Sequence, residues 1–247
     1  MSDERERRVM QDEEAIEKVR EICLKRRGAY SNNNAIVCGI VEEELSYDHS
    51  VKCEKFYRTK IKVERLSENT DIIPILISEI MLKNISKESI KGKKVKAVGQ
   101  FRSYSKREKD YTSHLKLFLF ATEFEIQDSV TDESFDMNMI FLDGYLCKKP
   151  ILRKTYKGRV ITDLLIAVNR EYNKSDYIPC IAWGRIAKWL TKFEVGDRFQ
   201  LYGRIQSREY LKTTVFENEE EISELKTAYE ISIRRIQNKQ DNNLEEI

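Results

Sequence analysis

The sequence predicts an all-β protein that consists of two small five-stranded barrels in tandem. Two observations lead to this prediction: an internal repeat spaced by 104 or 105 residues, and apolar residues that alternate with a period of two through most of both copies. With 247 residues, of which 40% are hydrophobic, the chain is long enough for two domains of roughly 100 residues each. No apolar run approaches the ~20 residues that a membrane-spanning helix needs.

The repeat is clearest in the glycines and prolines. Six of the nine glycines and two of the three prolines fall into register with a single one-residue shift: Gly39 with Gly144, Pro74 with Pro179, Gly92 with Gly196, and Gly99 with Gly203. We therefore expect four segments: an N-terminal helical extension (1–33), a first barrel (34–127), a second barrel (138–237) and a short acidic tail (238–247). Residues 128–136 form an acidic linker between the barrels.

The order of elements within each copy indicates which barrel this is. Alternation predicts strands, for example Val160 to Val168 and Tyr229 to Ile233, and one short helix per copy, at 184–193 and 78–85. Glycines inside strands suit the sharp bends of a small closed barrel. Three strands, a short helix and two more strands are typical of the oligonucleotide-binding (OB) fold.

The segment before the first barrel predicts a helix over 11–27, with Ile16, Val19, Ile22 and Cys23 on one side. We expect this helix to pack on its own barrel. A dimer contact or a site for a partner protein remains the alternative.

Several functional classes are disfavoured by the sequence. The five cysteines are scattered singly and there are only two histidines, so we expect reduced thiols and neither metal nor cofactor. No phosphate-binding loop and no nucleophile beside a base are present, which predicts a protein without catalysis. The charged N-terminus lacks the apolar stretch of a secretion signal, so we expect a cytoplasmic, nucleoid-associated protein.

The charge distribution favours a polyanionic partner for the second copy. Residues 138–212 carry a net charge of +8, whereas residues 34–137 carry −1. Binding a single strand requires cations along the phosphates and aromatic rings that stack on bases. The second copy offers both, with rings at Tyr172, Tyr177, Trp183 and Tyr210, and cations at Lys148, Lys149, Arg153, Lys154, Arg159, Arg170, Arg185, Arg204 and Arg208.

An ordered set of motifs in the second copy resembles the bacterial single-stranded DNA-binding protein (SSB) family. The motifs are Gly144-Tyr-Leu-Cys-Lys-Lys-Pro150, Asp163-Leu-Leu-Ile-Ala-Val-Asn-Arg170, Tyr177-Ile-Pro-Cys-Ile-Ala-Trp183-Gly-Arg, Val195-Gly-Asp197 and Tyr202-Gly-Arg-Ile-Gln-Ser-Arg-Glu-Tyr210. The resemblance implies that the four rings named above stack on bases. It further implies a homodimer, because family members work with four barrels together.

The first copy departs from this pattern. The positions that correspond to the four rings are Ser67, Ile72, Ser78 and Lys106, none of them aromatic. We expect a degenerate barrel that serves mainly for assembly. A smaller basic and aromatic contact remains open at Tyr104, Tyr111, Arg102, Lys106 and Arg107.

Two further departures bear on function. The C-terminus lacks the Pro-Phe tip by which family members recruit replication and repair enzymes, so those partners are in doubt. The acidic stretch 217–221 would repel phosphates if it lay over the binding face, although we expect a solvated loop that points away. The hypothesis is a protein that coats single-stranded DNA during replication, recombination or repair. The alternatives are a primosome-type protein-interaction module and a binder of single-stranded RNA.

Overall fold

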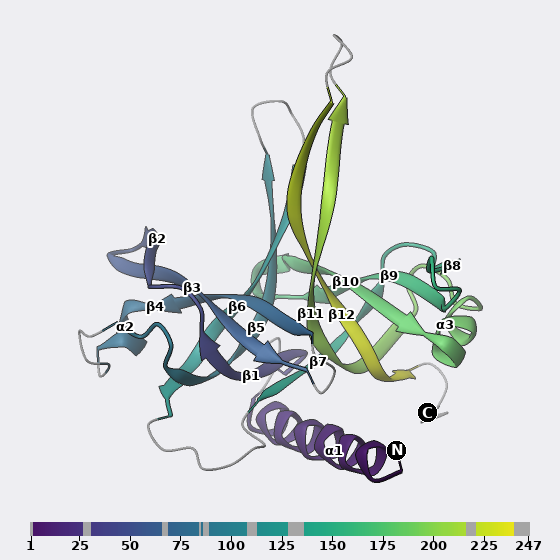
Figure 1. Ribbon diagram of the computed structural model, residues 1–247, viewed down its shortest axis with the longest axis horizontal. Helices are drawn as coiled ribbons and strands as arrows, with labels where there is room; N and C mark the ends of the chain where they lie inside the picture. Colours follow the sequence, from purple (N-terminus) through teal and green to yellow (C-terminus); the bar gives the residue numbers. More distant parts are fainter. Residues whose placement is uncertain are drawn as a thin grey trace.

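The computed structural model describes residues 2–26, 31–65, 69–83, 85, 89–107, 113–127, 136–215 and 221–239. A long helix, α1 (Ser2–Lys25), is followed by two sets of strands in the same order (Figure 1). The first set is β1 (Asn33–Val41), β2 (Ser46–Val51), β3 (Glu54–Glu64), β4 (Thr70–Ser78), α2 (Glu79–Leu82), β5 (Lys94–Arg107) and β6 (Ser113–Ile126). The second set is β7 (Met137–Leu146), β8 (Ile151–Lys154), β9 (Val160–Asn169), the 3-10 turn η2 (Glu171–Asn173), β10 (Ser175–Trp183), α3 (Gly184–Leu190), β11 (Arg198–Val215) and β12 (Glu221–Asn238).

Each set closes into a five-stranded barrel. In the first, β1 pairs with both β5 and β3, which closes the order β3-β4-β6-β5-β1. In the second, β7 pairs with both β11 and β9 in the same way. The short strands β2 and β8 extend β3 and β9 at the edges. The predicted fold class, tandem OB barrels with an N-terminal helix, is confirmed.

Four of the six repeated glycines lie where the neighbouring backbone leaves no room for a side chain, whereas Gly92 and Gly196 lie in turns with positive φ of 78° and 101°. A Cβ on Gly39 would overlap the carbonyl oxygen of Lys62, and a Cβ on Gly144 would lie 2.5 Å from that of Ala167, at the two places where a barrel closes. Gly99 and Gly203 follow the matching β-bulges of β5 and β11. Close approach of strands at barrel closures and bulges, together with the positive φ of the third pair, therefore explains why the repeat is clearest in glycine.

The two barrels join through β1 and β7, which pair antiparallel and make one continuous sheet of 12 strands. In this pairing Ala35 lies opposite Ile140, its own counterpart 105 residues further on. Asn33 opposite Leu142 and Val37 opposite Asn138 are likewise equivalent pairs. The junction therefore has the register of a two-fold axis, as in an interface between identical subunits, although both halves belong to one chain.

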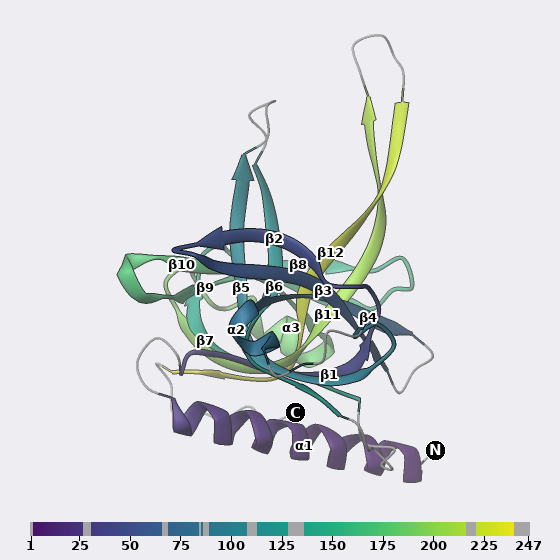
Figure 2. The same ribbon diagram turned by 90° about the vertical axis from the view of Figure 1, so that its left-hand side faces the viewer.

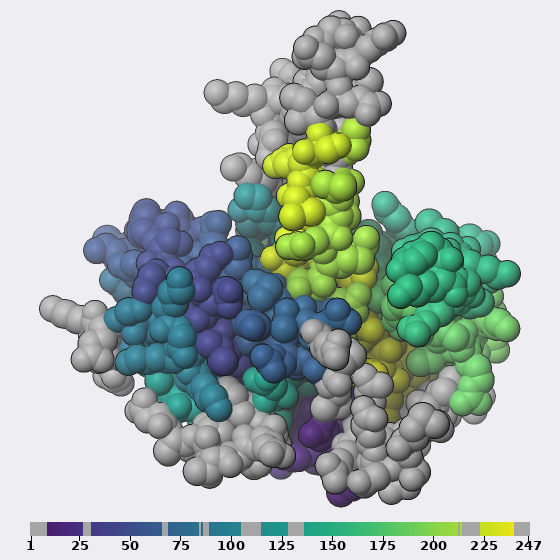
Figure 3. Space-filling model, viewed as in Figure 1, coloured from purple at the N-terminus to yellow at the C-terminus, as the bar shows by residue number. Residues whose placement is uncertain are grey.

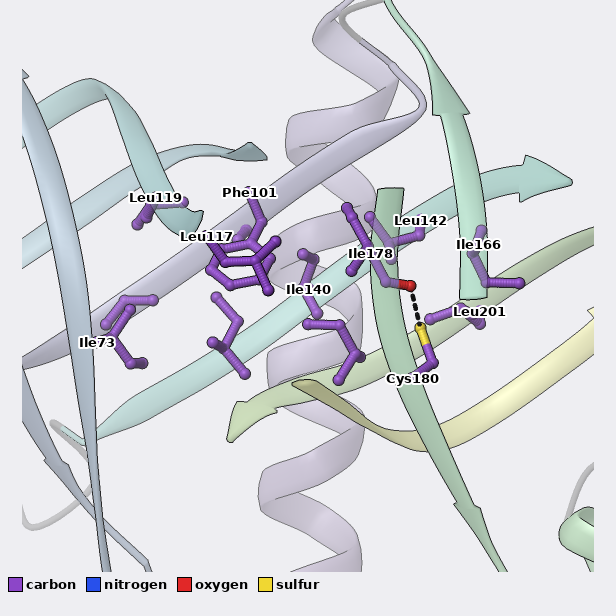
Figure 4. Close-up of a cluster of buried hydrophobic side chains, with 14 of the residues drawn as sticks. Ile73, Phe101, Leu117, Leu119, Ile140, Leu142, Ile166, Ile178, Cys180 and Leu201 are labelled. Atoms are coloured by element: carbon purple, nitrogen blue, oxygen red, sulfur yellow. Dashed lines mark hydrogen bonds between the residues drawn. The ribbon is translucent and has the colours of Figure 1, made fainter. Parts of the chain in front are cut away.

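One cluster of buried hydrophobic side chains runs through both barrels. Figure 4 shows Phe101 and Leu117 of the first barrel in the same cluster as Ile140, Leu142 and Ile178 of the second. A smaller cluster lies under α1, where Ala15, Ile16 and Val19 pack on β1 and β7. The helix covers the face opposite the two long hairpins, β5–β6 and β11–β12 (Figure 2). It is longer than predicted because its first two turns are polar and carry no apolar periodicity.

Two buried carboxylates form hydrogen bonds and ion pairs across the contact between the barrels. Asp71 Oδ1 accepts the backbone N–H of Ser207 at 3.0 Å, and Asp176 Oδ1 accepts that of Ser103 at 2.7 Å. Each carboxylate also faces one arginine from each barrel: Arg65 and Arg204 at Asp71, Arg170 and Arg102 at Asp176. The carboxylates, the serines and the arginines of the same barrel are counterparts under the repeat, whereas Arg102 and Arg204 occupy different positions in the two copies. Within the described residues, no helix is both long and apolar enough to span a membrane.

Candidate nucleic-acid interface

The outer face of β10 carries two of the four rings expected to stack on bases. Ile178, Cys180 and Ala182 point into the core, so the alternate residues point outward. Tyr177 is 46% exposed and Trp183 is half-buried, both on this outer side. Six residues of extended strand separate them by roughly 20 Å, enough for several nucleotides of an unpaired strand.

Tyr172 lies just before β10, in the turn that connects it to β9. Its backbone is in the left-handed region with φ 59°, and Asn173 follows with φ 55°. The N–H of Arg170 donates to the Lys174 carbonyl at 2.7 Å and closes the turn. The ring of Tyr172 is 91% exposed, so both of its faces are open to a ligand.

Tyr210 stands on the β11 arm of the second long hairpin. It is 39% exposed, and the Arg208 guanidinium lies 5.9 Å from the ring centroid. Because Arg208 and Tyr210 are two residues apart on one strand, they share a face, so a cation and a ring are presented together.

Trp183 lies in an open groove of about 510 Å³. Its indole N–H donates to Ser232 Oγ at 3.3 Å, which fixes the ring orientation. Three cations line the groove beside it, Arg159, Arg185 and Lys188. Lys188 was not among the residues expected from the sequence. Its spacing of three from Arg185 on the helix α3 is the signal that could have identified it.

The remaining expected cations divide into exposed and buried groups. Lys148, Lys149, Lys154 and Arg208 are exposed, as is Arg153, which forms a bidentate contact with Asp163. Lys149 forms an exposed ion pair with Glu194 at 3.0 Å.

Arg170 and Arg204 instead lie at the junction between the barrels. Arg170 is half-buried beside Asp176. The Arg204 side chain is only 17% exposed and faces Asp71, and burial lowers its pKa to about 10. Arg204 is held at Asp71 of the other barrel, and little of its side chain is left exposed for a phosphate.

A carboxylate also belongs to this face. Glu230 on β12 accepts a hydrogen bond from Gln206 Nε2 at 3.1 Å and lies near Arg208 and Arg153. Burial raises the pKa of Glu230, and the two arginines oppose this shift. An incoming phosphate would meet this negative charge. The acidic loop residues 217–220, Tyr111 and the tail from 240 onward, all named above, lie outside the described residues.

Comparison with known proteins identifies relatives of the second barrel. A family model described as the single-strand binding protein family matches residues 137–238, the span from β7 to β12. Single-stranded DNA-binding protein B of Bacillus subtilis is 32% identical over 93 residues, which cover 35% of this chain and 77% of that protein. Single-stranded DNA-binding protein 2 of Listeria innocua is 35% identical over 81 residues, 30% of this chain and 51% of that protein.

A solved structure matches both barrels. A crystal structure of a deletion mutant of the single-stranded DNA binding protein from Thermus aquaticus aligns with a TM-score of 0.64 and 15% identity. The alignment covers 89% of this chain and all of that one, so the likeness is one of fold. The chain spans about half the length of most of the sequence relatives that it matches.

Proposed function

The chain belongs to the single-strand binding protein family, and on this premise we propose that it coats single-stranded DNA without catalysis. The bases stack on Tyr172, Tyr177, Trp183 and Tyr210, and the phosphates follow the exposed cations of the second barrel, which we take as the domain 138–237. Cellular roles in replication, recombination or repair belong to the same proposal.

One observation carries the proposal: the four rings are all at least partly exposed, and they lie on the outer side of one barrel among basic side chains. Each stacked base contributes ~1–3 kcal/mol, so two or three stacks suffice for a stable complex once phosphate contacts are added. Every base has a flat face, so such a track accepts any sequence. The cations add affinity that falls as salt rises, because counterions released into a saltier solution gain less entropy.

Tryptophan fluorescence tests the proposal directly. Of the two tryptophans, Trp183 lies in the groove, while Trp189 packs edge-on against Phe193 at 4.5 Å. We expect an oligo-dT strand to quench the fluorescence at low salt, and we expect the quenching to persist in Trp189→Phe. Trp183→Ala should remove the quenching and weaken binding by a factor of ~5 to 100, measured by the anisotropy of a labelled strand. Unchanged anisotropy on titration with the strand would overturn the proposal, and competition with matched RNA strands separates DNA from RNA.

We also propose that two copies of the chain form a homodimer, which would bring four barrels together. The β1 and β7 edges are already paired within one chain, so a second copy must attach elsewhere. Sedimentation velocity should give twice the 29.2 kDa of one chain. A mass of 29.2 kDa at micromolar concentration, with and without the DNA strand, would contradict this part of the proposal.

A further inference from the structure

A large groove runs along the first barrel, in the part of the chain where none of the family's aromatic positions is kept. Its volume is about 870 Å³, against about 510 Å³ for the groove at Trp183. The outer face of strands β3 to β6 forms most of it, and residues of β2, Arg170, and Thr227 and Tyr229 of the β11–β12 hairpin complete it. Figure 3 shows that hairpin standing between the two barrels.

Rings and cations alternate across this groove in the register of the strands. Arg102 lies opposite Phe118 and Tyr104 opposite Lys116 on β5 and β6. Arg58 and Lys60 lie opposite Leu76 and Pro74 on β3 and β4. Cross-strand neighbours are ~5 Å apart, so each apolar surface has a positive charge beside it.

The aromatic surface is open to solvent on one side. Tyr104 is 43% exposed and meets Phe118 edge-on, with 6.0 Å between the ring centroids. Phe118 and Phe120 are half-buried, and the Arg102 guanidinium lies 5.5 Å from the Phe120 ring. A base entering here would meet the flank of one ring and the edge of the next.

The charge of the groove favours an anion. Five cationic side chains and one carboxylate, Asp48, line it. Arg102 and Arg170 share the buried Asp176, which leaves Arg58, Lys60 and Lys116 as the cations that can meet an anion. Arg58 and Lys60 form ion pairs with Asp48 and Glu43, and the side chains of Arg58 and Lys60 are 52% and 37% exposed, so a phosphate can reach both cations. Lys116 is exposed and makes no ion pair with any described residue.

The exposed rings of the first barrel lie on a different strand from those of the second, so the repeat offsets do not locate them. Phe118 pairs with Arg102, whereas Glu230 pairs with Gln206, the counterpart of Arg102 104 residues further on. Phe118 thus occupies the place of Glu230. The aromatic surface lies on β5 and β6 instead of on β10 and its turn.

The groove adjoins the proposed binding surface of the second barrel at Tyr172. Arg102 and Arg170 line both this groove and a smaller pocket of about 160 Å³ whose wall includes Tyr172. We propose that the first barrel carries a second site for an unpaired nucleic-acid strand. Tyr104, Phe118 and Phe120 supply the stacking surface, and Arg58, Lys60 and Lys116 contact phosphates. This inference rests on the function proposed above and extends the path of the strand across both barrels.

The test compares two strand lengths on the full chain. One OB barrel covers ~4–16 nucleotides, so an oligo-dT of about 12 occupies the second barrel alone and one of about 35 spans both. We expect Tyr104→Ala to weaken binding of the long strand about five- to 100-fold and to leave the short strand unchanged. Tyr145→Ala is the matched control, since Tyr145 is 39% exposed and lies outside the groove, with Arg198 5.9 Å from its ring.

A second variant tests the phosphate contact by a different measurement. Lys116→Ala should lower the slope of log K against log salt for the long strand by about 0.7, the value for one phosphate contact on a single strand. Lys116→Arg should restore the slope.

The outcomes separate the two proposals. Suppose Tyr104→Ala and Lys116→Ala bind the long strand as the unchanged protein does, while Trp183→Ala weakens it. The groove is then not a strand site and a protein segment becomes its better candidate, while the proposed function stands. If only Tyr104→Ala weakens binding, the groove is the main site and the proposed binding surface on the second barrel is wrong. If none of the three weakens binding, both proposals fail.

Discussion

At the scale of single residues, the two barrels keep the same buried polar contacts. The Asn138 side chain donates to the Ile205 carbonyl at 2.7 Å and accepts the Ile205 N–H at 3.0 Å. Asn33 makes the same two bonds with Phe101. Because each asparagine side chain both donates and accepts a buried hydrogen bond, few other residues can replace it.

We therefore expect Asn138→Ala to lower the free energy of unfolding by about 2–4 kcal/mol, because it leaves the buried N–H and carbonyl of Ile205 without hydrogen-bond partners. Urea denaturation measures the change. Asn169→Ala, at an exposed site, is the control and should shift it by less than ~0.5 kcal/mol. An equal loss for the two variants would contradict this explanation.

Glu230 gives a residue-scale prediction for pH. Burial raises its pKa, so the neutral form appears at a higher pH than for an ordinary glutamate, and nearby phosphates shift it further in the same direction. Binding of the strand should then take up a proton, and affinity should rise as pH falls through this pKa. The anisotropy of a labelled DNA strand, measured between about pH 7 and 5, checks this prediction.

Glu230→Gln should bind more tightly at neutral pH and lose the rise in acid. Glu125→Gln, at a 58% exposed side chain on β6, is the control and should keep the profile of the unchanged protein. A rise in acid that survives in Glu230→Gln would assign the proton to another group.

At the scale of elements, α1 is held by a narrow apolar stripe. Val19 is fully buried between the helix and the joined strands, with Met139 and Phe141 in the same cluster. The helix packs within its own chain as expected, but it lies across the junction of both barrels and not on the first barrel alone.

Val19→Ala should cost about 1–3 kcal/mol, the transfer of two methyl groups plus part of a cavity. Chemical denaturation followed by circular dichroism measures the cost. Leu24→Ala is the matched control because Leu24 is 77% exposed, and it should leave stability unchanged. Equal stability of both variants with the unchanged protein would mean that the helix adds nothing to the fold.

The elements also show what the sequence can and cannot predict. Glycine spacing and alternation located the strands of both barrels, because closure and burial impose those patterns. The strands β2 and β8 were not predicted, because they are almost wholly exposed and so lack the alternation of buried and exposed residues. Arg204 was expected on the phosphate path. Its partner Asp71 lies on the other barrel, and only the docking of the barrels brings the two residues together.

At the scale of the whole molecule, the shared sheet and core make the two barrels one unit. The side chains of Asp71 and Asp176 are 0% and 1% exposed, and each neutralises arginines from both barrels. Removing either carboxylate leaves buried positive charge without its partner.

We expect Asp71→Ala and Asp176→Ala to destabilise the chain by similar amounts, about 3–5 kcal/mol. Because the core is continuous, calorimetry should show a single transition for each variant. Glu64→Ala, at a 63% exposed side chain, is the control and should melt like the unchanged protein. Two separated transitions would mean that the barrels fold independently.

The pairing of Ala35 with Ile140 has an evolutionary consequence. In an assembly of identical subunits, every substitution appears twice, so neither half can change alone. Here the symmetric junction is built from two separately encoded segments, and each half can diverge while the other is retained. The second barrel carries rings on and beside β10, whereas the first carries Phe118 and Phe120 on β6, a difference that two copies of a single-barrel chain could not have.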